Sequence, residues 1–184
     1  DFIPIFEQNG FITTMDRYVW EEAAKALKTF KDMGIKPFAI SINLSRRDLY
    51  NDDLVQILLD MLKKYGLDER YLHLEITESA YTDNPEQIIK MTRALREAGF
   101  IIEMDDFGKG ASSLTMLSAL PIDILKMDMG FVDNSASRRI LGFVISLAKW
   151  LGVGIIVEGV ETKEQRLELL GLDCTYAQGY YYSK

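Results

Sequence analysis

Only one cysteine and one histidine occur among the 184 residues of the sequence. The lone cysteine, Cys174, excludes an internal disulfide and fits a reducing compartment, so we expect a cytoplasmic domain, which could still belong to a membrane-anchored parent. One histidine and one cysteine cannot build a typical zinc site. No apolar run is long enough to span a bilayer, and no secretory signal is visible.

Basic residues are also in the minority, with 21 lysines and arginines against 28 aspartates and glutamates and a net charge of −7. This balance argues against non-specific binding of DNA or RNA, because such binding needs a basic surface. It does not exclude a phosphate-bearing ligand, provided that metal ions screen the carboxylates. With 48% hydrophobic and 27% charged residues, the chain is typical of one globular domain with a real core.

Short runs rich in isoleucine, leucine and valine alternate with segments whose apolar residues recur at helical spacing. We predict strands at 37–44, 71–77, 100–105, 122–127 and 154–158, and the start of another at the C-terminal end. We predict helices at 16–32, 51–65, 85–99, 111–119, 135–152 and 162–171, the first of them capped by Asp16. Such alternation predicts a parallel sheet covered by helices, either an open doubly wound sheet or a (β/α)₈ barrel. No glycine-rich phosphate fingerprint follows a strand, which weakens the dinucleotide-binding alternative.

Polar residues end each of the predicted strands. In chain order they are Asn43, Glu75, Asp105 with Asp106, Lys126 and Glu158. Because the carboxyl ends of parallel strands meet on one face, where the active sites of such folds lie, we expect these side chains to converge. Carboxylate and amide oxygens suit Mg²⁺ or Mn²⁺, and two such ions about 3.5–4 Å apart can clamp a phosphodiester and activate a water. We therefore interpret Asp105 and Asp106 as metal ligands.

Several of these residues also have a simpler structural interpretation. An isolated pair of aspartates is more often a helix cap or a loop element than a metal site. Lys126 could be a lysine of the barrel core that pairs with Glu158 and has no catalytic role. Period-two alternation places His73 on the same side of its strand as Glu75, and we interpret His73 as a structural residue that faces inward. The strand-end positions taken together favour the metal site.

Seven stretches of the sequence resemble one known family. They are FIPIFEQNGFI (2–12), SINLS (41–45), LEITES (74–79), DDFGKGASSL (105–114), ILKMD (124–128), VEGVET (157–162) and AQGYYY (177–182). In this order, and over the whole chain, they resemble the EAL-domain family of bacterial cyclic di-GMP phosphodiesterases. The resemblance implies a single, partial EAL domain over residues 1–184 with a variant of the (β/α)₈ TIM barrel. It also implies hydrolysis of cyclic di-GMP to linear pGpG with two Mg²⁺ or Mn²⁺ ions.

The resemblance assigns roles position by position. It implies that the metal ligands are Asn43, Glu75, Asp105, Asp106 and Glu158. It implies that Glu158 also helps to activate the water and that Lys126 orients it. Glu78 matches the glutamate that steadies the loop after DDFG, and the supporting positions around the metals and substrate are Asp128, Glu161 and Gln178.

The chain departs from the family in three places. The Glu-Ala-Leu motif is absent, because the chain begins after that point. We expect about six strands here, without the first two of the barrel. Because unpaired edges promote aggregation, either the parent protein supplies the missing strands, which we favour, or another chain fills the gap. The loop that usually reads DDFGTGYSSL carries Lys109 and Ala111, and Glu103 stands where the family usually has a small or apolar residue.

Other classes of function stay open at this point. A degenerate family member would sense cyclic di-GMP or act as a protein-interaction scaffold without hydrolysing it. A different metal-dependent barrel enzyme, such as a lyase acting on an enolate, would share the strand-end carboxylates but would not explain the EGVET and QGYYY segments. The resemblance further implies a homodimer and a parent protein with sensor or diguanylate-cyclase-like domains, and we expect no binding of polymeric nucleic acid.

Overall fold

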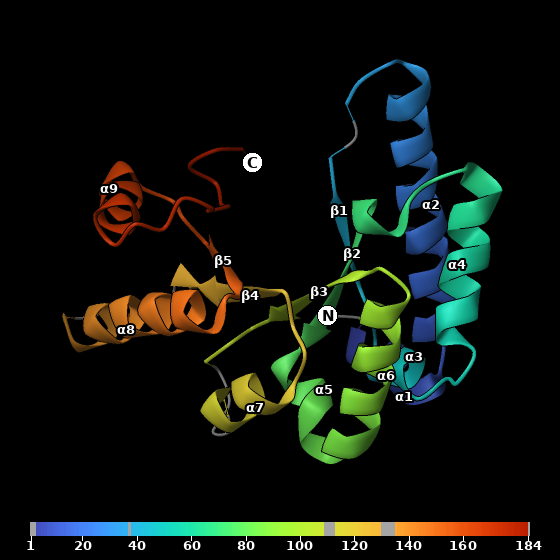
Figure 1. Cartoon of the computed structure of the whole chain (residues 1–184), viewed down its shortest axis with the longest axis horizontal. Helices are drawn as coiled ribbons and strands as arrows, with labels where there is room; N and C mark the ends of the chain where they lie inside the picture. The colour runs from blue at the N-terminus through green and yellow to red at the C-terminus, as the bar shows by residue number, and fades with distance from the viewer. Residues whose placement is uncertain (1–2, 37, 109–112, 130–134, 184) are drawn as a thin grey trace.

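A computed structural model describes residues 3–36, 38–108, 113–129 and 135–183 of the chain. In this part of the chain, five parallel strands form one sheet in the sequential order β1-β2-β3-β4-β5 (Figure 1). Their bounds are Ile40–Asn43 (β1), Leu72–Thr77 (β2), Ile101–Asp105 (β3), Ile124–Asp128 (β4) and Gly154–Glu158 (β5). The predicted parallel sheet is therefore confirmed.

Helices connect the strands, as the alternation predicts. They are α1 (Ile3–Asn9), α2 (Ile12–Asp32), α3 (Arg46–Leu49), α4 (Leu54–Tyr65), the 3₁₀ turn η1 (Glu69–Tyr71), α5 (Glu78–Asp83), α6 (Pro85–Glu97), α7 (Ser113–Ala119), α8 (Ser135–Leu151) and α9 (Lys163–Gly171). Among the described helices, none is long and apolar enough to cross a membrane. The first residues of the helix predicted at 111–119, and residue 37 of the first predicted strand, lie outside the described residues.

The sequential strand order distinguishes between the two sheet types that the sequence left open. A doubly wound sheet reverses its strand order at a switch point, whereas a (β/α)₈ barrel adds each strand beside the previous one. Here every strand pairs with its predecessor in parallel register, for example Ile42 with Leu74 and Leu125 with Ile155. The sheet is therefore of the TIM-barrel type.

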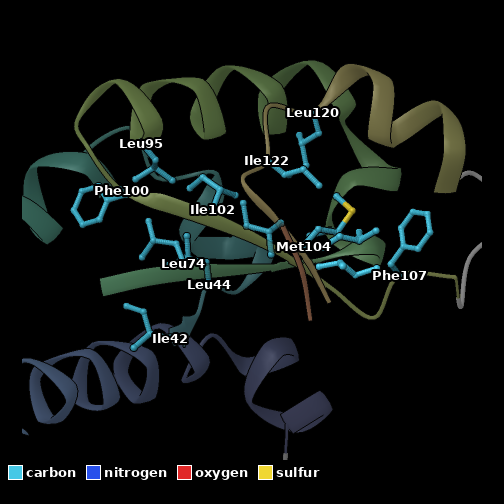
Figure 2. Packing of buried hydrophobic residues seen from close by; sticks show 14 of the residues in the cluster. Ile42, Leu44, Leu74, Leu95, Phe100, Ile102, Met104, Phe107, Leu120 and Ile122 are labelled. Atoms are coloured by element: carbon cyan, nitrogen blue, oxygen red, sulfur yellow. The ribbon is translucent and has the colours of Figure 1, made fainter. Parts of the chain in front are cut away.

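One face of the sheet is apolar and lies against the helices. Leu72, Leu74 and Ile76 alternate along β2 and are fully buried, and α6 packs Leu95 against the neighbouring strand β3 (Figure 2). Burying one such side chain stabilises the fold by about 1.5–3 kcal/mol. The opposite face of the same strands carries the polar residues, so the alternation of β2 separates the core from the site.

Two predictions of local structure are wrong. The C-terminal segment adds only an isolated bridge between Val157 and Ala177 and then turns, so the described residues form five strands rather than about six. Gly179 lies at a φ of +148° against the backbone of Val160, and the chain bends there instead of extending. Asp16 does not cap the first helix, because α2 already begins at Ile12 and encloses Asp16 in its second turn.

Candidate active site

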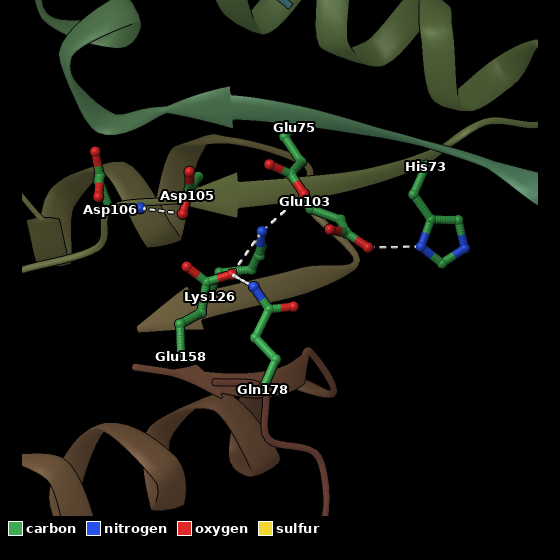
Figure 3. A network of polar contacts seen from close by, with 8 residues as sticks. All are labelled: His73, Glu75, Glu103, Asp105, Asp106, Lys126, Glu158 and Gln178. Atoms are coloured by element: carbon green, nitrogen blue, oxygen red, sulfur yellow. Dashed lines mark hydrogen bonds and ion pairs between the residues drawn. The ribbon is translucent and has the colours of Figure 1, made fainter. Parts of the chain in front are cut away.

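The carboxyl ends of the strands bring the predicted polar residues to one rim of the sheet (Figure 3). The register places Asn43 of β1 beside Glu75 of β2, and Asp128 of β4 beside Glu158 of β5. These pairs follow from parallel pairing alone, since equivalent strand positions lie side by side in a parallel ladder. The rim therefore gathers side chains that are far apart in the sequence.

The ammonium group of Lys126 links two strand-end carboxylates. Its Nζ lies 2.7 Å from Oε1 of Glu75 and 2.7 Å from Oε1 of Glu158. Lys126 and Glu75 are buried, at 5% and 9% exposure, so both charges depend on each other for stabilisation. The two ion pairs join β2, β4 and β5 around one cation.

Burial and charge act in opposite directions on this group of residues. Burial raises the pKa of Glu75, and although Lys126 counteracts it, the pKa stays above its usual value, with a further contribution from the charge of Asp105. Burial alone would lower the pKa of Lys126, but hydrogen bonds and charge from Glu158 and Glu75 raise it well above the usual value. Lys126 is therefore a permanent cation at neutral pH.

Gln178 extends this network from the C-terminal segment. Its Nε2 donates to Oε1 of Glu158 at 2.6 Å, the same oxygen that faces Lys126. Two backbone hydrogen bonds hold Gln178 in place, one to the carbonyl of Val157 at 2.9 Å and one from the amide of Val160 at 3.1 Å. The turn that replaces the predicted sixth strand thus fixes the position of Glu158.

The two adjacent aspartates end β3 in an unusual backbone conformation. Asp106 adopts a φ of 59°, in the left-handed region that aspartate tolerates better than most residues. Its backbone N–H donates to Oδ1 of Asp105 at 2.7 Å (Figure 3). Glu78 holds the following residues, because its Oε2 accepts a hydrogen bond from the backbone N–H of Gly108 at 3.2 Å. Lys109 and Ala111, the departures in this loop, lie outside the described residues.

The remaining predicted residues lie around this network. Asn43 is exposed at the end of β1, where its carbonyl accepts a hydrogen bond from Nε1 of Trp20 at 3.0 Å. Asp128 is half-buried at the end of β4, where its Oδ1 would lie 3.1 Å from a Cβ added at Gly159. Glu161 is exposed, and its backbone N–H donates to Gln165 at the start of α9. Glu161 is thus at the edge of the site.

The donor set suits hard divalent cations, since it consists of carboxylate and amide oxygens. The residues that would hold them are Asn43, Glu75, Asp105, Asp106 and Glu158. Within the described residues, however, no group of three or more His, Cys, Asp and Glu side chains is placed to hold a metal ion. One reason is that the carboxylates of Glu75 and Glu158 are both in contact with the ammonium group of Lys126.

A second polar pair lies on the inner face beside this network. Nδ1 of His73 is 2.6 Å from Oε1 of Glu103, and Glu103 is 1% exposed. Burial alone would raise the pKa of Glu103, but the hydrogen bond and charge of His73, a hydrogen bond from Ser41 and the charge of Lys126 hold it below the usual value. Glu103 is therefore an ionised carboxylate in the interior.

One polar residue of this region was missed as a site residue. Asp16 lines a cavity of ≈ 370 Å³ that also reaches Asn43 and Ser45. It is buried, and its Oδ2 has no hydrogen-bond partner among the described residues. Burial raises the pKa of Asp16 to about 7, helped by the hydrogen bond and charge of Asp48. Its place on the apolar stripe of α2, one turn after Ile12, was the signal that could have revealed its burial.

Comparison with known proteins identifies the family of the chain. A family model described as the EAL domain matches residues 1–184. The chain is 35% identical to the signaling protein YkoW of Bacillus subtilis over 100% of this chain and 23% of YkoW. It is 36% identical to the cyclic di-GMP phosphodiesterase NbdA of Pseudomonas aeruginosa over 100% of this chain and 24% of NbdA. The chain thus spans about a quarter of the length of these relatives.

A solved structure gives the same result in three dimensions. The PaMucR phosphodiesterase in complex with c-di-GMP superposes with a TM-score of 0.92 at 32% identity, over 100% of this chain and 76% of that chain. The family model and the solved structure therefore agree. The chain belongs to the EAL domain family.

Proposed function

We propose that this chain is the greater part of a phosphodiesterase domain that hydrolyses cyclic di-GMP to linear pGpG with two Mg²⁺ or Mn²⁺ ions, in bacterial second-messenger signalling. The observation that carries the proposal is the position of Lys126 between Glu75 and Glu158 on the rim of a TIM-barrel sheet. Relatives that are named cyclic di-GMP phosphodiesterases support the substrate.

Each residue of the rim has a distinct part in the proposed reaction. Divalent ions bound by the strand-end oxygens would neutralise phosphate charge and lower the pKa of a water. Lys126 orients the attacking water, because its ammonium only donates hydrogen bonds and so turns the water's lone pair toward Nζ. Glu158 accepts the proton of that water at a carboxylate oxygen. Gln178 holds Glu158 in the orientation that this transfer requires.

The cavity beside Asn43 is a candidate site for one guanine base. Its walls include Ile12, Val19 and Trp20, which offer apolar surface to a purine ring. The buried Oδ2 of Asp16 lacks a donor, and guanine presents two neighbouring donors, N1–H and the 2-amino group, on its pairing edge. We infer that Asp16 accepts hydrogen bonds from that edge.

A product assay on the full-length protein tests the proposal. Incubation with cyclic di-GMP and Mg²⁺ or Mn²⁺ is expected to yield pGpG, and chelation of the metal is expected to stop it. The alternative is a degenerate domain that senses the nucleotide without hydrolysing it. Nucleotide binding without turnover, in the presence of either metal, would establish the sensor and reject the enzyme.

The chain matches only a part of the length of each relative, and this concerns the domains that accompany it. Because it covers about a quarter of YkoW and NbdA, we propose that the parent protein carries further domains of the sensor or diguanylate-cyclase type. We also propose a homodimer. Light scattering of the full-length protein with and without cyclic di-GMP measures the oligomeric state directly.

A further inference from the structure

The pair of His73 and Glu103 has no part in the reaction proposed above, and yet it lies on the face that carries the site. Nδ1 of His73 and Oε1 of Glu103 are 2.6 Å apart. Glu103 is 1% exposed. Its other oxygen, Oε2, is buried without a hydrogen-bond partner in the described part of the chain. A half-satisfied buried carboxylate is costly, and the fold keeps it directly beside the rim.

Glu103 and Glu75 are neighbours across the sheet. The register of β2 and β3 pairs Glu75 with Glu103, so the two carboxylates leave the sheet on the same face. Lys126 is in contact with Glu75, and its charge also acts on Glu103, although less than His73 and Ser41 do. Two neighbouring carboxylates therefore compete for one buried ammonium group.

Figure 3 shows how the competition is resolved. The side chain of Glu103 extends away from Lys126 and toward His73, whereas Lys126 contacts Glu75 and Glu158. An ionised carboxylate can only accept hydrogen bonds, so Nδ1 of His73 carries the hydrogen in this contact. His73 thereby supplies the donor that occupies Oε1 of Glu103.

We propose that His73 is a positioning residue that holds the carboxylate of Glu103 away from Lys126, so that the ammonium stays on Glu75 and Glu158. Without the donor of His73, Glu103 would keep only the hydrogen bond from Ser41 and would draw Lys126 toward the interior. The water-orienting role of Lys126 would then be lost. This inference rests on the proposed phosphodiesterase function.

Variants of the full-length protein test it by rescue. His73→Leu removes the donor and is expected to lower kcat by about tenfold or more while KM changes by less than about twofold. His73→Asn keeps an N–H near the position of Nδ1 and is expected to stay within about threefold of the wild type. The double variant His73→Leu with Glu103→Gln removes the competing charge and is expected to recover kcat to within about threefold.

A purely structural role would give a different pattern. His73→Leu would then lower the unfolding temperature without a selective loss of kcat, and the second substitution would not restore turnover. Either result overturns the inference. If His73→Leu does not fold, the double variant decides, because the inference requires it to fold and to be active.

A measurement that does not depend on enzymatic activity separates this inference from the proposed function. In a crystal structure of His73→Leu, we expect Nζ of Lys126 to have moved into ion-pair contact with Glu103. Lys126 still in contact with both Glu75 and Glu158 would contradict it. Absence of turnover in the wild type would reject the phosphodiesterase proposal and leave this structural comparison valid.

Discussion

Lys126 and Glu75 form a 2.7 Å ion pair between strands that are not neighbours, since β3 lies between β2 and β4. The pair therefore crosses over β3 on the inner face of the sheet. Both side chains are buried, and neither could be stable there without the other. The arrangement fixes a cation at the point where the strand-end carboxylates meet.

Removal of this cation should be costly for both stability and activity. We expect Lys126→Met to lower the free energy of unfolding by about 3–5 kcal/mol, because it leaves Glu75 buried without a partner. We expect turnover of cyclic di-GMP to be lost in the fraction that stays folded. Urea denaturation measures the first effect. Lys149→Met is the matched control, because Lys149 pairs with the exposed Asp173, and its stability should equal that of the wild type.

Stability should depend on pH through Asp16. The pKa of Asp16 is about 7 in the folded chain, above the unfolded value of about 3.9, so the folded state binds the extra proton between these two values. The stabilisation of the folded state by this proton is therefore complete below the unfolded pKa and is lost as the pH rises through about 7. Asp16→Asn should stabilise the chain at pH 8 by about 1–3 kcal/mol and leave it unchanged at pH 4.

Thermal unfolding at the two pH values checks this prediction. Asp60→Asn is the control, because Asp60 is exposed on α4 and should show no such difference. Equal stabilisation of Asp16→Asn at both pH values would show that Asp16 does not carry the extra proton. The same variant should weaken binding of cyclic di-GMP at pH 8, if Asp16 reads a guanine edge as an ionised carboxylate.

The turn at Gly179 should be intolerant of a side chain. A Cβ added there would lie 2.3 Å from the carbonyl oxygen of Val160, in a backbone conformation that few side chains adopt. We expect Gly179→Ala to destabilise the domain by about 2 kcal/mol or more and to lower kcat, since it displaces Gln178 from Glu158. Gly171→Ala has open space around the new Cβ, so it should behave as the wild type in both assays.

Glu78 should act on the loop rather than on the sheet. Its contact with the backbone of Gly108 anchors the residues that follow Asp106. We expect Glu78→Gln, which keeps an acceptor oxygen, to retain most of the activity, and Glu78→Ala to lower kcat by about tenfold or more. Steady-state kinetics with excess Mn²⁺ compares them. Equal activity of the two variants would show that the anchor has no role in turnover.

The sequence was sufficient to predict the sheet and the convergence of its polar ends. Runs such as Leu72–Thr77 alternate apolar and polar residues, and parallel pairing then determines which side chains meet. The predicted contact between Lys126 and Glu158 exists, but its second partner, Glu75, was not predicted as one. That contact spans an intervening strand and depends on side-chain length and direction, which a strand pattern does not contain.

The misassignments have a common physical cause. Asp16 has the chemistry of a helix cap, but the turn before it is helical too, and tertiary packing buries it. The tyrosine-rich C-terminal segment has strand propensity, but Gly179 bends it against Val160. In both places a contact distant in the sequence outweighs a local preference.

Carboxylates from separate strands are expected to bind the divalent ions that hydrolysis requires. Calorimetric titration of Mn²⁺ into the full-length protein, compared with its Asp105→Asn variant, tests it most directly. We predict uptake of Mn²⁺ by the wild type and a clear loss of uptake in the variant, which should remain folded and be inactive. No uptake by the wild type, or unchanged uptake and turnover in Asp105→Asn, would contradict it.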